Sequence, residues 1–318
     1  MERVNIHKKM IRDIKIIEEM IQKAIENSDQ FKEMGEVATY VPELANVNAD
    51  NYGVALVKTN GEKVLKGDKD IKFSIQSISK VIDLIMAIED FGFAKVFNKV
   101  GTEPTEYKFN SIIPIKDKAA NPLINAGAIT TCALIKGDSV EEKFNRVLNK
   151  VKKLSGSEDV VFLENVYHSE MQTTDINRSI SYYLKSRDII EGNAEEILDL
   201  YVRNCSIGVN IEQLANIAAV LANGGMSLDG KEQLISKDAV KVTLALMTAC
   251  GMYEESGRYL VEVGFPSKSG VSGAIIAIIP GKCGVCTYSP RLDGSGNSIR
   301  GKLILEEISK TLDLNIFV

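Results

Sequence analysis

The chain has 318 residues and a net charge of −5, and 45% of its residues are hydrophobic and 25% charged. These are the proportions of an ordinary globular protein. Charges of both signs are interspersed, which excludes the clustered basic surface of a nucleic-acid-binding protein. No segment approaches the ~20 apolar residues of a membrane span, and the charged residues 1–28 are not expected to form a signal peptide.

Scarce histidines and scattered cysteines narrow the possible chemistry. The chain has only two histidines, which disfavours a histidine-based catalytic triad and a histidine-rich metal site. Its five cysteines are odd in number, so we expect reduced thiols and a cytoplasmic location rather than a disulfide framework.

The first predicted element is an amphipathic helix over residues 8–27, where apolar side chains recur at three- and four-residue spacing. Its opposite face is acidic and anionic lipid would repel it, so we expect this helix to dock on the body of the protein. A strand over 52–59 is followed by Asn60-Gly61, a dipeptide typical of a tight hairpin turn to a second strand. The helix that follows is expected to end at Gly92, because glycine commonly follows the last helical turn.

The rest of the chain is predicted to be mostly helical until strands return near its end. Helices are predicted over 125–136, 140–154, 176–186, 194–203, 211–223, 237–250 and 297–312, and strands over 273–280 and 283–289. Residues 103–123 contain three prolines and predict an irregular loop.

Strands at both ends of the chain, with helices between them, predict one sheet built from distant segments. The expected fold class is α+β, with a mostly antiparallel sheet flanked by helices and a helical subdomain. We expect a single unit over 1–318, with the sheet part at about 30–76 and 256–318 and the helical part at about 77–255.

A Ser-x-x-Lys arrangement, Ser77-Ile-Ser-Lys80, begins the helix after the hairpin. The i, i+3 spacing places both side chains on one helical face, and the positive end of the helix dipole disfavours an ammonium at Lys80. Burial can lower a lysine pKa by several units from its usual ~10.4, which would make Lys80 a general base for Ser77. The tetrapeptide alone also fits a capping serine and a solvated lysine. The preceding strand and the apolar helix favour the catalytic interpretation.

Lys268-Ser269-Gly270 stands just before the most apolar predicted strand. Lys-Thr-Gly or Lys-Ser-Gly ahead of a strand accompanies Ser-x-x-Lys in the penicillin-recognising enzymes, where that strand lies beside the nucleophile. The amide of Val271 could then join that of Ser77 in stabilising an oxyanion. Alone, the tripeptide would predict no more than a turn rich in small residues.

With further polar residues inside apolar stretches, the chain resembles the serine-dependent glutaminases of bacteria and animal mitochondria from about residue 35 onward. The landmarks of this resemblance are Val37-Ala-Thr-Tyr40-Val-Pro-Glu-Leu, Gln76-Ser77-Ile-Ser-Lys80, Asn121-Pro-Leu-Ile-Asn125-Ala-Gly-Ala-Ile, Ser169-Glu170 with Asn177, Leu221-Ala-Asn-Gly-Gly, Cys250-Gly-Met-Tyr253 and Lys268-Ser-Gly-Val271. The resemblance implies a fold like that of serine β-lactamases and transpeptidases. It also implies hydrolysis of L-glutamine to L-glutamate and ammonia through a glutamyl ester, by a homo-oligomer that is a tetramer or a dimer.

The same resemblance implies which residues bind the substrate. They are Ser77, Asn125, Glu170, Asn177, Tyr201, Tyr253 and Val271, with Tyr40 and Gln76 in the adjoining landmarks. Tyr253 and Tyr40 are the candidates expected to relay protons beside the nucleophile. Glu170 supplies negative charge for the substrate ammonium, and the Asn and Tyr201 side chains can donate to its carboxylate or share the ammonium.

Other interpretations remain open at this point. They are a β-lactamase or D-amino-acid peptidase, which the missing Ser-Asp-Asn triplet disfavours, and a non-catalytic amino-acid sensor, which the intact motifs disfavour. The preference for glutamine over asparagine rests on the resemblance alone.

No metal or cofactor is expected. Cys283 and Cys286 form a Cys-x-x-Cys, but residues i and i+3 of a strand point to opposite faces, so we interpret them as core and edge residues. Residues 293–297 (Asp-Gly-Ser-Gly-Asn) form a loop that lacks the Lys-Ser/Thr of a phosphate cradle.

Overall fold

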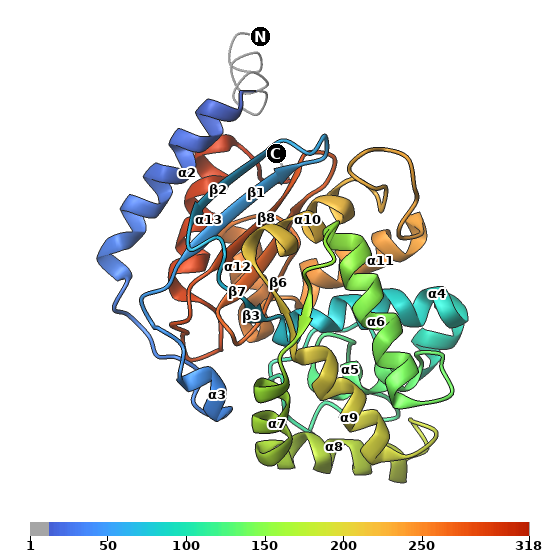
Figure 1. Cartoon of the computed structure of the whole chain (residues 1–318). Coiled ribbons are helices and arrows are strands. Elements are labelled where there is room, and N and C mark those ends of the chain that lie inside the picture. Colours follow the sequence, from blue (N-terminus) through green and yellow to red (C-terminus); the bar gives the residue numbers. More distant parts are fainter. Residues whose placement is uncertain (1–12, 318) are drawn as a thin grey trace.

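A computed structural model describes residues 13–317 and contains a five-stranded antiparallel sheet with the strand order β2-β1-β8-β7-β6 (Figure 1). Its strands are β1 (Gly53–Lys58), β2 (Lys63–Gly67), β6 (Ser267–Ser269), β7 (Ala274–Ile279) and β8 (Cys283–Tyr288). β1 and β2 form the predicted hairpin, in which Gly61 has a φ of +86°. β8 pairs with β1 over its whole length, which confirms that one sheet unites distant parts of the chain.

Helices cover both faces of this sheet (Figure 1). α2 (Ile14–Ser28) and α13 (Ile299–Leu312) pack against each other on one face, and α10 (Ile211–Ala222) packs on β8, β1 and β7 from the other. Because side chains alternate along a strand, β8 contributes Cys283 to the core beneath α2 and α13, and Cys286 to the core beneath α10. The expected opposite orientation of the two cysteines is confirmed. Their expected edge position is wrong, because β8 has a partner strand on each side.

α2 lies on the sheet through a stripe of buried apolar side chains at three- and four-residue spacing, namely Ile17, Ile21, Ala24 and Ile25. Arg300 of α13 fixes the C-terminal end of α2. The Arg300 Nε donates to Ser28 Oγ at 3.0 Å, and the Arg300 Nη2 donates to Asp29 Oδ1 at 2.5 Å. Residues 8–12 of the predicted helix lie outside the described residues.

The other helices lie mostly to the right of and below the sheet in Figure 1. They are α3 (Pro42–Ala45), α4 (Ser79–Lys99), α5 (Asn125–Ala133), α6 (Val140–Ser155), α7 (Glu164–Thr173), α8 (Asp175–Ser186), α9 (Ala194–Cys205), α11 (Lys237–Cys250) and α12 (Ser256–Glu262), with 3-10 turns η1 (Asp29–Phe31), η2 (Gln76–Ile78) and η3 (Tyr253–Glu255). A second sheet, of order β3-β5-β4, joins β3 (Phe73–Ser74), β4 (Val161–Phe162) and β5 (Ile207–Val209). None of the helices described within residues 13–317 is long and apolar enough to cross a bilayer.

Several elements differ from the sequence prediction for local reasons. The strands of the second sheet have only two or three residues, too few to show alternation, and α7 begins without a side-chain cap. The helix was expected to end at Gly92, and the helical conformation does break there: Gly92 has a φ of +77° and a ψ of +162°. A second helical segment follows this kink directly, so that α4 as a whole runs to Lys99. Lys268 and Ser269 were expected just before a strand; they lie on β6, the edge strand that pairs with β7.

Candidate active site

The turn η2, which carries the expected nucleophile Ser77, lies where the second sheet meets α4. β3 pairs with β5, the turn η2 follows, and α4 begins at Ser79. This places Ser77 and Lys80 on one face in the protein interior, with Lys80 Nζ 2.5 Å from Ser77 Oγ. The predicted pair is therefore in contact, and Gln76 before it has a φ of +47°, an unusual value for a residue with a side chain.

Electrostatics at this turn favour a neutral lysine. Lys80 is completely buried, and this burial lowers its pKa, although nearby acidic groups, among them Cys205 and Glu170, act in the opposite direction. A second fully buried lysine, Lys268 of β6, has its pKa held well below the usual value by burial and by the charge of Lys80. Two ammonium groups in one buried site repel each other, so this arrangement favours at least one neutral amine.

The edge strand β6 approaches the nucleophile turn closely. A Cβ added at Gly270 would lie 2.8 Å from the backbone oxygen of Ile75, so the glycine permits this approach. After Gly270 the chain turns tightly, with Gly273 N donating to Gly270 O at 2.9 Å. Among the backbone hydrogen bonds described outside helices and strands for residues 13–317, the amide of Val271 is not a donor. This is one of the two amides that were expected to bind an oxyanion; the other, that of Ser77, lies within the turn η2.

Tyr253 contacts both this strand and Ser77. Its hydroxyl donates to Ser269 O at 3.0 Å, its ring lies 4.3 Å from Lys268 Nζ, and its φ is +55°. Burial raises the pKa of Tyr253, and its hydrogen bonds to Ser77 and Ser269 act in the opposite direction. The phenol therefore keeps its proton at neutral pH and can donate it.

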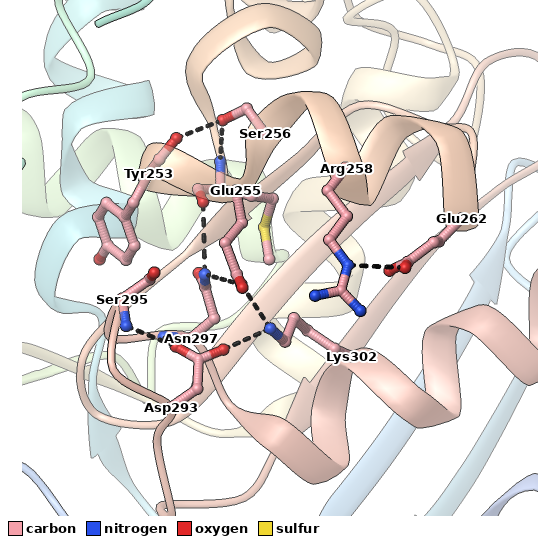
Figure 2. Close-up of polar contacts among 10 residues, drawn as sticks. Tyr253, Glu255, Ser256, Arg258, Glu262, Asp293, Ser295, Asn297 and Lys302 are labelled. Carbon is pink, nitrogen blue, oxygen red and sulfur yellow. Dashed lines mark hydrogen bonds and ion pairs between the residues drawn. The ribbon is translucent and has the colours of Figure 1, made fainter. Parts of the chain in front are cut away.

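A polar network holds the Tyr253 turn in this conformation (Figure 2). Ser256 Oγ donates to Tyr253 O at 2.8 Å and accepts from the Met252 amide at 3.0 Å. Asn297 Nδ2 donates to Met252 O at 3.3 Å and to Glu255 Oε2 at 3.0 Å. Lys302 of α13 forms ion pairs with Glu255 and Asp293, which fastens the turn to the loop at 293–297. These contacts compensate for the unfavourable backbone of Tyr253.

Glu170 of α7 is the buried acid expected to bind an ammonium. Gln76 Nε2 donates to its Oε2 at 3.2 Å, so the residue before the nucleophile also orients the acid. Burial raises the pKa of Glu170 to about 7, opposed by the Gln76 hydrogen bond and by the charge of Lys80. A buried carboxylate is costly unless it is paired, so Glu170 favours a positively charged ligand group beside it.

Two asparagines of the predicted site contact each other. Asn125, the first residue of α5, donates from Nδ2 to Asn177 Oδ1 at 2.8 Å, and Asn177 Nδ2 donates to Thr174 Oγ1 at 3.0 Å. Asn125 Oδ1 is buried and has no hydrogen-bond partner. An unpaired buried acceptor costs about 1–3 kcal/mol, so it favours a ligand that donates a hydrogen bond there.

The two remaining tyrosines occupy different positions. Tyr201 is buried, with its ring 5.6 Å from Lys80 Nζ. Tyr40 is 52% exposed, yet desolvation of its hydroxyl, followed by the charges of Glu170 and Tyr253, raises its pKa. A cavity of 750 Å³ is lined by Tyr40 and Val271, two residues of the predicted site, but not by Ser77. A cavity of 470 Å³ touches Val271 without reaching Tyr40 or Ser77.

Two residues near the nucleophile were missing from the predicted site. Lys268 was noticed only as part of a motif, although it contacts Tyr253. Phe109 lies in the predicted loop; its backbone oxygen accepts from the Asn125 amide at 2.8 Å, and its ring lies 4.7 Å from that of Tyr253. Periodicity cannot reveal a contact made by an irregular loop. No three His, Cys, Asp or Glu side chains of the described segment are grouped to hold a metal ion.

The glutaminase family model matches residues 35–317. The chain belongs to the glutaminase family. It is 44% identical to glutaminase 2 of Clostridium perfringens over 93% of this chain and 99% of that protein. It is 45% identical to a glutaminase of Clostridium tetani over 95% of this chain and all of that protein.

Solved structures agree with this glutaminase assignment. A Bacillus subtilis glutaminase in covalent complex with 5-oxo-L-norleucine, formed from 6-diazo-5-oxo-L-norleucine, is 35% identical with a TM-score of 0.87, covering 94% of this chain and 99% of that one. The predicted family and the predicted serine β-lactamase-like fold are both confirmed. The protein is therefore an amidohydrolase of the glutaminase type.

Proposed function

We propose that this glutaminase converts L-glutamine to L-glutamate and ammonia through a glutamyl ester on Ser77, with Lys80 as general base. The observation that supports this most directly is the 2.5 Å separation of Lys80 Nζ and Ser77 Oγ in a buried site. The covalent analogue complex of the B. subtilis relative is consistent with a nucleophile in this family.

The first half-reaction forms the ester. Neutral Lys80 accepts the proton of Ser77 Oγ, which attacks the carboxamide carbon of glutamine. The amides of Ser77 and Val271 stabilise the tetrahedral oxyanion, at about 3–4 kcal/mol per donor in related chemistry. The C–N bond then breaks, and a proton from the Lys80 ammonium, passed through the Tyr253 hydroxyl, completes the departing ammonia.

The second half-reaction uses water. Lys80, neutral again, accepts a proton from a water molecule that attacks the ester carbonyl, and the same two amides hold the oxyanion. The ester bond breaks, Ser77 recovers its proton, and glutamate leaves. The sum is glutamine plus water giving glutamate plus ammonia.

Substrate recognition is assigned to the polar residues around the nucleophile. Glu170, oriented by Gln76, pairs with the substrate ammonium, which can also donate to the unpaired Asn125 Oδ1. Asn177 and Tyr201 donate to the carboxylate. Tyr40 covers the bound amino acid, a role that its partial exposure permits.

We also propose that the chain works as one catalytic unit, as a homo-oligomer (a tetramer or a dimer), in the cytoplasm. The oligomer follows from the family resemblance. The cytoplasmic location is supported by the five buried cysteines, all with free thiols.

Ammonia release from glutamine tests the proposal. Ser77→Ala should lose activity by a factor of about 10³ or more, because the nucleophile is gone. Ser79→Ala is the matched control, since this buried serine of the same motif contacts Cys205 and should keep most activity. Full activity in Ser77→Ala would reject the proposed nucleophile. The same assay with asparagine, one methylene shorter, measures the side-chain preference.

A further inference from the structure

A second carboxylic acid lies buried beneath the catalytic pair. Ser77, Lys80 and Asp83 follow one another at three-residue spacing, so Asp83 is one helical turn below Lys80 on α4. Asp83 is completely buried. Among the described residues, the only other buried acid is Glu170. A buried carboxyl group is costly unless its surroundings compensate it, so its presence here requires an explanation.

The groups around Asp83 favour its ionised form. Asn204 Nδ2 donates to Oδ1 at 2.9 Å and Cys132 Sγ donates to Oδ2 at 3.3 Å, so both oxygens accept a hydrogen bond. Hydrogen bonds to both oxygens stabilise a carboxylate more than a neutral acid. Burial raises the pKa of Asp83 to about 7, while these two donors and the charge of Lys80 lower it.

Lys80 needs a negative partner only while it carries the proton of Ser77. When substrate is bound, the charge of Glu170 is matched by the substrate ammonium, which leaves Asp83 as the buried carboxylate available to Lys80. We propose that Asp83 is a positioning residue that stabilises the ammonium form of Lys80 during the reaction. The proton moves only between Ser77 and Lys80, and Asp83 acts by its charge. This inference rests on the proposed function of the catalytic pair.

No other ionisable neighbour of Asp83 complicates the pH dependence. From α5 it is faced by Cys132, and from α9 by neutral Asn204 and by Cys205. Burial, followed by the charge of Asp83, keeps the pKa of Cys132 well above its usual value, and burial raises the pKa of Cys205 to about 12. Both thiols therefore stay neutral below pH 9, so the groups of this cluster that can titrate are Asp83 itself, with its pKa of about 7, and Lys80, and in Asp83→Asn only Lys80 remains.

The test is the pH dependence of kcat for Asp83→Asn, measured as ammonia release between pH 5.5 and 9.5. The charge of Asp83, one helical turn away, raises the pKa of Lys80. A nearby opposite charge typically shifts a pKa by about one unit or more, so its removal should move the acid limb down by about one pH unit. The plateau kcat should fall, because a less basic lysine is a weaker general base. KM for glutamine should hardly change. The pH dependence of kcat is the appropriate measure, because it describes the enzyme with substrate bound. In that complex the substrate ammonium keeps Glu170 ionised, so Glu170 does not titrate in the measured range.

Asp90→Asn is the matched control. Asp90 lies on the same helix, where its carboxylate pairs with Arg146 at 2.7 Å, and this substitution should leave the acid limb in place. If Asp83→Asn does not fold, Cys132→Ala offers a second test, because it removes the hydrogen bond from Cys132 to the Asp83 carboxylate. This variant should move the acid limb of the kcat profile in the same direction, but by less. Cys132→Ser keeps a hydrogen-bond donor at this position and should leave the acid limb in place.

The outcomes separate this inference from the function on which it rests. An unchanged acid limb in Asp83→Asn and Cys132→Ala, with Ser77→Ala inactive, would overturn the role of Asp83 and leave the catalytic pair intact. Activity retained by Ser77→Ala would instead overturn the proposed function.

Discussion

Replacing Glu170 with glutamine should make the empty enzyme more stable and a poorer catalyst. The substitution keeps the size and shape of the side chain but removes its charge. Glutamine can still accept a hydrogen bond from Gln76, whose Nε2 lies 3.2 Å from the Glu170 carboxylate. The change therefore isolates the effect of charge at a buried position.

The magnitude follows from the pKa of Glu170. Burial raises this pKa from 4.5 to about 7 in the folded protein. The difference of roughly 2.5 pH units corresponds to about 3 kcal/mol, at ~1.36 kcal/mol per unit. Because the folded pKa is the higher one, the folded state holds the proton more tightly. Wild-type stability is therefore lost as the pH rises from about 4.5 through 7.

Urea denaturation at pH 5 and pH 8 measures this effect. At pH 5 most folded wild-type molecules carry a neutral Glu170, so the two proteins should differ little. At pH 8, Glu170→Gln should exceed the wild type in free energy of unfolding by up to about 3 kcal/mol. Glu164→Gln, an exposed position at the start of α7, should show no such gap and serves as control.

Bound glutamine should reverse the order of stability of the two proteins. Glutamine should stabilise the wild type, whose carboxylate meets the substrate ammonium, but hardly stabilise Glu170→Gln, and KM of the variant should rise. The reasoning would be refuted if the stability gap were the same at both pH values, because charge would then not be its cause.

Three further substitutions examine other parts of the structure. Gly270→Ala should lower kcat about tenfold or more in steady-state kinetics, since its Cβ would meet Ile75 O at 2.8 Å; a normal kcat would contradict this close approach. Tyr253→Phe should lower kcat by about 10² with stability retained, and wild-type turnover would remove the phenol from the proton relay. Ile21→Ala in α2 should cost about 2–5 kcal/mol of unfolding free energy by urea titration with kcat per folded molecule unchanged. A loss below about 1 kcal/mol would show that this helix contributes little.

The contact between Ser77 and Lys80 was predictable from local sequence. Ser77 and Lys80 are three residues apart, so helical spacing alone brings them together, and their contact is observed. The sheet was also predictable, because the apolar runs in β1, β7 and β8 and the Asn-Gly turn are strong local features. Resemblance to a family added the recognition residues.

Contacts between residues far apart in the sequence could not be predicted from local sequence patterns. Gln76 meets Glu170 across 94 positions of the chain, and Asp83 meets Asn204 across 121. Neither pair has a spacing that helix or strand geometry could reveal. The helix α7, which carries Glu170, was missed because it begins without a capping side chain. The edge strand β6 has three residues and was taken for the approach to a strand.

The pairing of β1 with β8 has a consequence for how the protein is made. Residues 53–58 can pair with β8 only after residues 283–288 have left the ribosome. Until then, β1 has β2 on one side and a free row of backbone donors and acceptors on the other, which is a template for pairing with another chain. Ribosome-bound chains that stop before β8 should therefore depend on chaperones more than the complete chain does.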